Sequence, residues 1–285
     1  MKIAHLIIAH NAPHQLKRLV QSLQHKDVDI FISIDLKTDI SPFLIFEEFD
    51  NVFFIKKRIN VYWGDYSLVQ STLIGFEEIL SSGRDYGFLN FISGSDYPLT
   101  SPDLFIEFLK KEPNTAFMEY YPIEDEWQEA IPRIRNYHLG YFRIKGMYTI
   151  QKLMNAVLPK RVMPYQMIAV GRSQWFTLPM ACVRYILDFL RQNPKVERYF
   201  KMVWGSDEII FQTILYNSPF KSILKNDNLR YIDWTAGGVS PKQLTMEDRD
   251  DLQQSGKFFA RKFNMDLDAV ILDVIDRDML IKKKI

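Results

Sequence analysis

Residues 2–35, KIAHLIIAHNAPHQLKRLVQSLQHKDVDIFISID, decide the fold class. The apolar run over 2–9 is typical of a strand that is buried on both faces of a sheet. Residues 13–24 then carry apolar side chains at helical spacing, and 29–34 form a second apolar run that ends at Asp35. A buried strand, a helix and another buried strand predict an α/β protein with a mostly parallel, Rossmann-like sheet flanked by helices.

The same alternation of strand-like and helix-like segments continues to residue 110. Parallel sheets bind ligands at the carboxyl ends of their strands. Asp35 and Asp96 each follow an apolar run, so both acids are candidate ligand contacts. Further strands are expected at 51–55 and 86–92, and helices at 43–49, 67–81 and 102–110.

Residues 120–170 show no regular period and mix basic with aromatic side chains. Because no glycine-rich linker sets this stretch apart, we interpret it as an insertion over the ligand site within a single domain that spans residues 1–285. Regular patterns return after residue 170. Helices are expected at 181–191 and 207–216, a short strand at 230–234, and wholly or partly helical segments at 247–255 and 268–280.

The composition excludes several classes of protein. Charge is balanced, with 36 Lys and Arg against 35 Asp and Glu, so the chain has no general attraction for nucleic acid. Cys182 is the only cysteine, which excludes an internal disulfide and favours a reducing compartment. No apolar run reaches the roughly 18 residues that a membrane span needs. The N-terminal residues predict a buried strand rather than a signal peptide.

Common cofactor and metal motifs are absent from the sequence. It contains no GxGxxG after the first strand, no Walker loop, no CxxC pair and no GxSxG. The five histidines have no partner at a spacing that suits zinc. A nicotinamide-dependent dehydrogenase, a P-loop enzyme and a zinc ribbon are therefore unsupported.

Two stretches carry candidate chemistry. In FISGSDYPL, residues 91–99, an apolar run enters a small polar turn that exposes the single carboxylate of Asp96. Glycine in such a turn lets a ligand approach the backbone, although a plain strand-ending turn has the same composition. In GSDEIIFQTIL, residues 205–215, a cap at Ser206 or Asp207 places Glu208 in the first turn of a helix. The alternative is an acid that only stabilises the helix.

Taken together, six short motifs resemble the core-2/I-branching enzymes and the peptide O-xylosyltransferases of glycosyltransferase family 14. The resemblance runs in order from about residue 60 to residue 265. Family members in eukaryotes carry a stem, a membrane anchor and disulfides, so this chain is similar to a trimmed, cytosolic, bacterial-type member. The motifs are YWG at 62–64, SGSDYPL at 93–99, RIRNYH at 133–138, GRSQWFTL at 171–178, SDEIIFQTIL at 206–215 and LRYIDW at 229–234.

The resemblance implies a GT-A type fold and an inverting transfer of sugar, GlcNAc or xylose, from a UDP-sugar without a metal ion. Many GT-A enzymes hold a divalent cation with an Asp-x-Asp sequence after a central strand. Here that position, 93–96, offers only one acid. The pairs at 27–29 and 266–268 fit the pattern but stand at the wrong places in the chain, and we expect no metal and no cofactor besides the UDP-sugar co-substrate.

The resemblance also assigns roles to individual residues. An inverting transfer needs one base for the acceptor hydroxyl, and family position gives that role to Glu208. A leaving UDP needs fixed positive charge when no metal is present, and Arg230 and Lys262 take that role, with Arg261 and Lys242 as weaker candidates. Donor contacts are further expected from His10, Asn11, Asp35 and Asp96, and acceptor or sugar contacts from Trp63, Arg135, Ser173 and Trp175.

The partners follow from the same resemblance. The acceptor is expected to be a glycan, a lipid-linked precursor or a polysaccharide, shaped on the 120–170 side, and the location to be cytoplasmic or peripheral to an inner membrane. The basic tail at 281–285 offers membrane contact, although a solvated chain end is the simpler interpretation. Two alternatives stay open: a metal-dependent or retaining transferase, and a catalytically inactive protein that binds UDP or carbohydrate.

Overall fold

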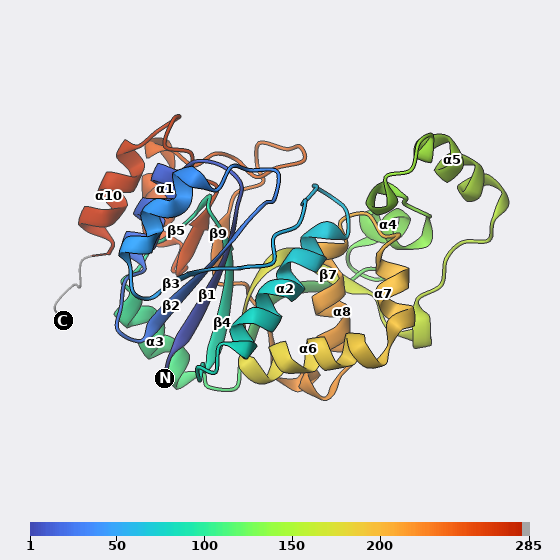
Figure 1. Cartoon of the computed structure of the whole chain (residues 1–285), viewed down its shortest axis with the longest axis horizontal. Helices are drawn as coiled ribbons and strands as arrows, with labels where there is room; N and C mark the ends of the chain where they lie inside the picture. Colours follow the sequence, from blue (N-terminus) through green and yellow to red (C-terminus); the bar gives the residue numbers. More distant parts are fainter. Residues whose placement is uncertain (281–285) are drawn as a thin grey trace. The chain divides into compact units, whose positions relative to one another are not determined.

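The computed structural model describes residues 1–280, which its contacts divide into two compact units (Figure 1). Unit 1 comprises Met1–Ile55, Asp85–Pro113 and the described part of Leu229–Ile285. Unit 2 comprises Lys56–Arg84 and Asn114–Asn228. The organisation as a single glycosyltransferase domain stays a prediction, and the basic tail at 281–285 lies outside the described residues.

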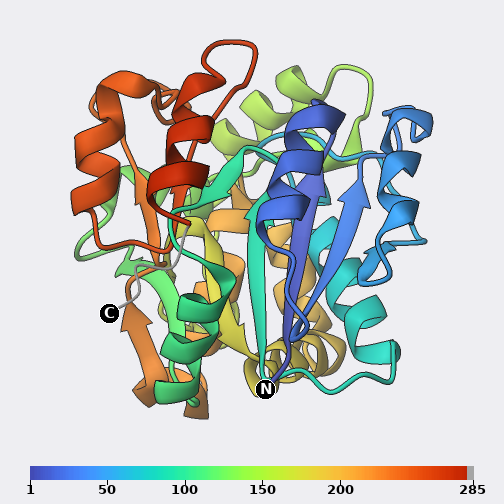
Figure 2. The ribbon, with the colours of Figure 1, turned by 90° about the vertical axis from the view of Figure 1, so that its left-hand side faces the viewer.

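Unit 1 is built around parallel strands in the order β3-β2-β1-β4. Apolar residues run along both central strands, so β1 and β2 are buried over almost their whole length. Figure 2 shows the carboxyl ends of β1, β2 and β4 at one edge of the sheet. The strands are β1 (Ile3–Ala9), β2 (Val28–Ile34), β3 (Val52–Phe54) and β4 (Phe88–Ser93).

The longer helices of unit 1 bury apolar side chains on one face. Helix α1 begins at a proline and buries Leu16, Leu19 and Val20, as its spacing predicts. The segment expected as a helix at 43–49 is instead a 3₁₀ helix, η1. The elements are α1 (Pro13–Ser22), η1 (Ser41–Glu48), α3 (Pro102–Lys111), η7 (Met246–Asp248), α9 (Arg249–Gln254) and α10 (Val270–Asp278).

A second sheet of unit 1 joins residues that lie far apart in the sequence. Its order is β5-β10-β9, where β10 runs antiparallel to β5 and parallel to β9. The register places Arg261 opposite Asp96 and Phe259 opposite Arg230. This sheet therefore brings together two of the recognised motifs and the basic segment around residue 261. The strands are β5 (Asp96–Pro98), β9 (Arg230–Ile232) and β10 (Phe259–Arg261).

The strands of unit 2 follow the order β7-β6-β8. Strand β6 is antiparallel to β7, with a shift of register between Met118 and Tyr120, and parallel to β8. The sequence predicts no strand in this unit, because residues 120–170 have no regular period and 171–178 stands out only as a motif. The strands are β6 (Ala116–Pro122), β7 (Val170–Pro179) and β8 (Leu224–Asn226). Most strand pairs of the chain are parallel and helices flank them, so the predicted fold class is confirmed.

The helices of unit 2 include the long predicted segments at 67–81 and 181–191. Helix α5 belongs to the predicted insertion and buries no residue. Within residues 1–280, no helix combines the length and apolar character that a membrane crossing requires. The elements are α2 (Ser67–Ser81), η2 (Gln128–Ala130), α4 (Ile131–Arg135), η3 (Gly140–Phe142), α5 (Met147–Val157), η4 (Pro164–Gln166), α6 (Met180–Gln192), α7 (Pro194–Phe200), η5 (Ser206–Glu208), α8 (Ile210–Tyr216) and η6 (Pro219–Ile223).

The helix expected over 207–216 begins three residues later than predicted, at Ile210. Residues 206–208 instead form the separate 3₁₀ turn η5, which follows the left-handed Gly205. Ile209, with φ −128°, interrupts the helical path between the turn and the helix. Neither Ser206 nor Asp207 caps the helix, so the expectation that Glu208 lies in its first turn is wrong.

Candidate active site

The carboxyl edge of the parallel strands in unit 1 carries three of the residues assigned to the donor. Ala9 pairs with Ile34 in register, so His10 and Asn11 leave β1 level with the end of β2. Asp35 ends β2, where its Oδ1 accepts a hydrogen bond of 2.9 Å from the backbone N–H of Lys37. His10 and Asn11 are exposed, whereas the side chain of Asp35 is 10% exposed and pairs with Lys37 at 3.3 Å. The carboxyl ends of parallel strands are the usual ligand position in α/β folds.

Asp96 is buried at the start of β5 and is held from two sides within unit 1. Its Oδ2 accepts a hydrogen bond of 2.6 Å from the backbone N–H of Ser93, which closes the turn between β4 and β5. Its Oδ1 lies 3.2 Å from Nε of Arg261. Because Asp96 is 1% exposed, its carboxylate does not face solvent. It pairs with the guanidinium of Arg261 and fixes that group on β10.

Lys262 directly follows this ion pair and is half-buried. Its carbonyl accepts a hydrogen bond of 2.8 Å from the N–H of Leu244, which fixes the backbone. Burial lowers the pKa of Lys262, the neighbouring Arg261 lowers it further, and Asp96 acts in the opposite direction. An anionic ligand stabilises the charged form of such a partly dehydrated cation, because it supplies the counter-charge that the protein lacks there.

Arg230 on β9 is also basic but is turned into the interior of unit 1. It is 3% exposed, and its Nη2 donates to the side chain of Asn90 and, at 3.0 Å, to the carbonyl oxygen of Phe91. Asn90 in turn contacts His5 at 2.9 Å. Burial, and then the charge of Arg230, lower the pKa of His5 to about 3, so this histidine is neutral. Arg230 thus joins β9 to β4.

In unit 2 the carboxylate of Glu208 is held by an arginine. Nη1 of Arg133 donates a hydrogen bond of 2.6 Å to Oε2 of Glu208. The same guanidinium lies 4.9 Å from the ring centre of Trp127 and 4.5 Å from that of Trp204. The side chain of Glu208 is 32% exposed, so it is oriented by the protein and still reaches solvent. An oriented, accessible carboxylate can accept a proton from a bound hydroxyl.

Asp207 lies beside Glu208 in η5 and is buried. Burial, and then the charge of Glu208, raise the pKa of Asp207 to about 8. Among the described residues, Oδ1 of Asp207 and Oγ of Ser206 have no hydrogen-bond partner. Two adjacent acids thus occupy opposite environments: Asp207 is neutral at pH 7, whereas Glu208 faces water and a cation.

Close backbone contacts fix the turn that carries Glu208. A Cβ at Gly171 on β7 would lie 2.4 Å from the carbonyl oxygen of Glu208 and 3.0 Å from Cα of Ile209, so only glycine fits there. The N–H of Gly205 donates a hydrogen bond of 2.8 Å to the carbonyl oxygen of Gly64. The motifs at 62–64, 133–138, 171–178 and 206–215 therefore meet around one carboxylate within unit 2.

The residues assigned to the acceptor or sugar occupy unequal positions in unit 2. Trp63 is 65% exposed and packs its ring edge-to-face on Trp204, with ring centres 5.2 Å apart. Arg135 is exposed and pairs with Glu124 at 2.6 Å. By contrast Ser173 and Trp175 are buried.

Ser173 links three segments of unit 2. Its Oγ accepts a hydrogen bond of 3.2 Å from Asn228, and its carbonyl oxygen accepts one from Gln212 of α8. Ser173 therefore holds β7 against α8. Its effect on a ligand is indirect, through the residues that it positions.

The structure adds residues that were not assigned a role from the sequence. Arg133 stands in the motif RIRNYH and Asp207 in SDEIIFQTIL, but the sequence gives Arg133 no individual role and Asp207 only that of a helix cap. Arg261, a weaker candidate, turns out to be the partner of Asp96. The ion pairs of Arg133 and Arg261 leave no local pattern, because their partners lie far away in the sequence. The recognised motifs contain Arg133 and Asp207 but not Arg261.

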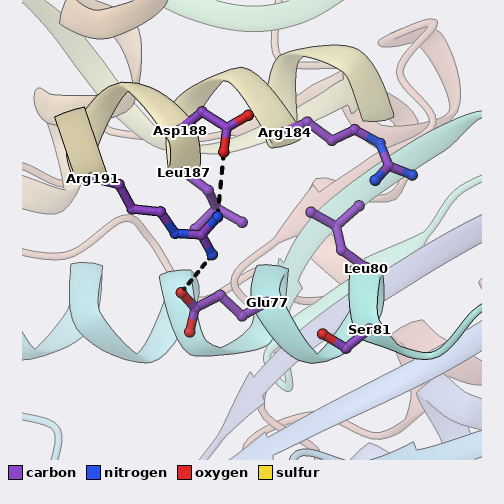
Figure 3. A pocket seen from close by; sticks show the side chains of 7 residues that line it. All are labelled: Glu77, Leu80, Ser81, Arg184, Leu187, Asp188 and Arg191. Carbon is purple, nitrogen blue, oxygen red and sulfur yellow. Dashed lines mark hydrogen bonds and ion pairs between the residues drawn. The ribbon is translucent and has the colours of Figure 1, made fainter.

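A separate cavity of about 260 Å³ lies between α2 and α6 (Figure 3). Arg191 crosses it, 3.2 Å from Glu77 and 3.3 Å from Asp188. Leu80, Ser81, Arg184 and Leu187 complete the lining, which contains none of the residues predicted for the site. In the part of the chain that the structure describes, no three His, Cys, Asp or Glu side chains gather as metal ligands would.

Comparison with known proteins places the chain in a family. The model of the Core-2/I-Branching enzyme family matches residues 3–254. Xylosyltransferase 2 of Rattus norvegicus is 24% identical over 303 residues, which cover 97% of this chain and 33% of the relative. Xylosyltransferase 1 of the same species is 24% identical over 300 residues, with 97% and 35% covered. The chain thus spans about a third of the length of these relatives.

Solved structures resemble the chain only distantly. Apo mouse xyloside xylosyltransferase 1 has a TM-score of 0.37 and 10% identity, with 90% of this chain and 97% of that one covered. The Mn/GDP form of core-mannan synthase A from Aspergillus fumigatus has the same score and identity, with 78% and 71% covered. The family model covers far more than half of the residues, and the chain belongs to the Core-2/I-Branching enzyme family.

Proposed function

We propose that this chain is an inverting, metal-independent glycosyltransferase that moves GlcNAc or xylose from a UDP-sugar to a hydroxyl group of a glycan or glycoconjugate. Membership of the Core-2/I-Branching enzyme family and the similarity to xylosyltransferases support a transfer of sugar. The single observation that carries the proposal is the carboxylate of Glu208, oriented by Arg133 and accessible to solvent.

Glu208 acts as the general base in this proposal. An inverting transfer is one in-line displacement, in which the acceptor oxygen loses its proton as it attacks the anomeric carbon. The hydrogen bond of 2.6 Å from Arg133 fixes the carboxylate, and the tight contact at Gly171 fixes the backbone beneath it. Burial raises the pKa of Asp207 and favours its neutral form, so of the two adjacent acids Glu208, which reaches solvent, is the one placed to take the proton.

The departing diphosphate meets Lys262 and Arg261. Both belong to one segment of unit 1, and burial disfavours the charged form of Lys262 until an anion is bound. Asp96 holds Arg261 in place and balances its charge in the absence of donor. Arg230 has a positioning role, because its guanidinium is occupied by Asn90 and by the carbonyl oxygen of Phe91. His10, Asn11 and Asp35 serve the uridine.

The sugar and acceptor contacts divide in the same way. Trp63 is a largely exposed aromatic side chain, against which sugar C–H groups can pack, and Arg135 offers hydrogen bonds at the surface. Trp175 and Ser173 support the site from inside. The 120–170 segment shapes the acceptor side, for which a lipid-linked or polysaccharide precursor is our proposal.

The test is release of UDP from a panel of UDP-sugars, with and without EDTA, by the wild-type chain and by Glu208→Gln. The substitution keeps the shape of the side chain and removes the base, so we expect a loss of about 10²- to 10⁴-fold in kcat. Glu197→Gln on α7 is the matched control: it changes the same chemical group in the same unit and leaves the turn at 206–208 intact.

Each outcome decides one part of the proposal. Release that resists EDTA and disappears in Glu208→Gln supports the metal-free mechanism and the base together. Release that requires Mn²⁺ overturns metal independence. A product with the anomeric configuration of the donor overturns inversion. If UDP binds in calorimetry but no donor is turned over with any acceptor, the chain is an inactive UDP- or carbohydrate-binding protein.

A further inference from the structure

Helix α5 of unit 2 directs two polar side chains, those of Gln151 and Asn155, toward the loop before it, and exposes several apolar side chains. Oε1 of Gln151 accepts a hydrogen bond of 2.9 Å from the N–H of Leu139. Asn155 exchanges two hydrogen bonds, 2.8 Å and 2.9 Å, with the backbone of Tyr137. These amides hold the helix to the loop before it. The helix buries no residue, and in Figure 1 it extends away from the strands of its own unit.

Exposed apolar side chains gather on α5 and on the segments directly before and after it, and we call this group the α5 surface. Leu153 is 62% exposed, Val157 68% and Val162 79%. Single exposed apolar residues are common, but a cluster of them marks a surface that meets an apolar partner. The exposed members of the α5 surface are Phe142, Ile144, Tyr148, Ile150, Leu153, Val157, Leu158, Val162, Tyr165 and Ile168.

The positive charge of the same segment indicates that the partner of the α5 surface is anionic. Residues 142–168 contain cations and no Asp or Glu. Lys145 and Lys152 are exposed, and within residues 1–280 no acid pairs with either. Apolar side chains interleaved with lysine, with tyrosines beside them, are the composition of helices that lie in the interface of an anionic bilayer. The other cations of the segment have partners within unit 2: Arg143 pairs with Asp65, Lys160 donates to Asn136, and Arg161 donates to the carbonyl oxygens of Tyr199 and Met202.

We propose that the α5 surface docks on a membrane that contains anionic phospholipid, with Leu153, Val157 and Val162 entering the interface and Lys145 and Lys152 facing the headgroups. Helix α5 is 11 residues long, far shorter than a membrane span, so it lies along the interface and does not cross the bilayer. These residues lie in the 120–170 segment that we assign to the acceptor side, but none of them is the base or a donor contact, and vesicle binding is measured without any transfer of sugar.

Flotation of the full chain with vesicles tests the proposal. Vesicles of phosphatidylcholine mixed with an equal amount of phosphatidylglycerol are compared with vesicles of phosphatidylcholine alone. We expect binding to the anionic vesicles only, and release at high salt. The double variant Lys145→Gln/Lys152→Gln should lose about five-fold in affinity per lysine. Leu153→Gln/Val157→Gln should lose about ten-fold or more.

The matched controls are Lys110→Gln/Lys111→Gln on α3 and Leu267→Gln, which make the same changes at exposed positions of unit 1 and should bind like the wild type. Binding to neither kind of vesicle overturns the proposal, and so does an affinity that the α5 variants leave unchanged. Sedimentation velocity covers the competing partner: a wild-type dimer that Leu153→Gln/Val157→Gln dissociates would assign the surface to a second copy of the chain.

Discussion

The buried carboxyl of Asp207 couples the stability of the protein to pH. Burial raises its pKa to about 8 in the folded chain, whereas an aspartate in an unfolded chain titrates near 4. Between these values the folded state holds a proton that the unfolded state releases. Stability therefore falls as pH rises through this window, and the penalty is complete above the folded-state value.

Asp207→Asn removes this titration and keeps the shape of the side chain. We expect the variant to exceed the wild type in stability by on the order of a few kcal/mol at about pH 9, and the difference to shrink toward zero near pH 4. Urea denaturation across that range measures it. Asp188→Asn, at an exposed acid of α6, is the control and should follow the wild-type curve. Parallel curves for Asp207→Asn and the wild type would show that Asp207 is charged at neutral pH.

At the scale of elements, strand β7 and the turn η5 are packed so closely that there is no room for one more methyl group between them. Gly171→Ala places a Cβ 2.4 Å from the carbonyl oxygen of Glu208, and the neighbour is backbone, which cannot rotate away. We expect a loss of about 1–3 kcal/mol in the free energy of unfolding. We also expect kcat to fall about ten- to hundred-fold, because the base moves with the turn.

Gly140→Ala controls for the general effect of a glycine-to-alanine change. A Cβ at Gly140 would meet Cβ of Asp65 at 3.7 Å, an ordinary contact, so stability and turnover should stay close to those of the wild type. Denaturation and UDP release are measured on both variants. A Gly171→Ala chain with unchanged kcat would mean that the turn carrying Glu208 is positioned by other contacts.

Which elements could be predicted from the sequence depends on the range of their contacts. Residues 2–9 and 29–34 were recognised as strands because long apolar runs are a local signal. The strands at 96–98 and 259–261 are only three residues long and exist because they pair with each other across the chain. The predicted start of α8 is wrong for a related reason. The left-handed Gly205 and the contact with β7 shape the turn before the helix, and the spacing of apolar residues reports neither of them.

The same distinction between local and long-range contacts decides which features of the candidate site could be predicted from the sequence. Glu208 and Asp96 stand inside motifs that resemble a family, so their positions could be named from sequence alone. Arg133 also stands in a motif, but its ion pair with Glu208, like that of Arg261 with Asp96, joins distant segments and leaves no trace in local patterns. Burial also distinguishes the two cations assigned to the diphosphate, and the sequence does not report it: Lys262 is half-exposed, whereas Arg230 is buried.

At the scale of the whole molecule, the assigned roles follow the two units. The residues assigned to the donor all belong to unit 1, and the base and the residues assigned to acceptor or sugar all belong to unit 2. Each unit combines segments from distant parts of the chain, so this partition is invisible in the linear order. It makes donor binding and proton transfer separable by substitution, because the residues for each step sit on different units.

Thermal unfolding with UDP in the presence of EDTA tests that separation. A ligand that binds only the folded state stabilises it by about 2.7 kcal/mol at roughly 100 times its Kd, which corresponds to a rise in Tm of roughly 5 °C for a chain of this size. Glu208→Gln should keep the full rise, since the base does not hold UDP. Lys262→Gln should lose most of it, because the half-buried cation no longer meets the diphosphate. A rise that appears only with Mn²⁺, or one that Lys262→Gln retains in full, would show that another group neutralises the diphosphate.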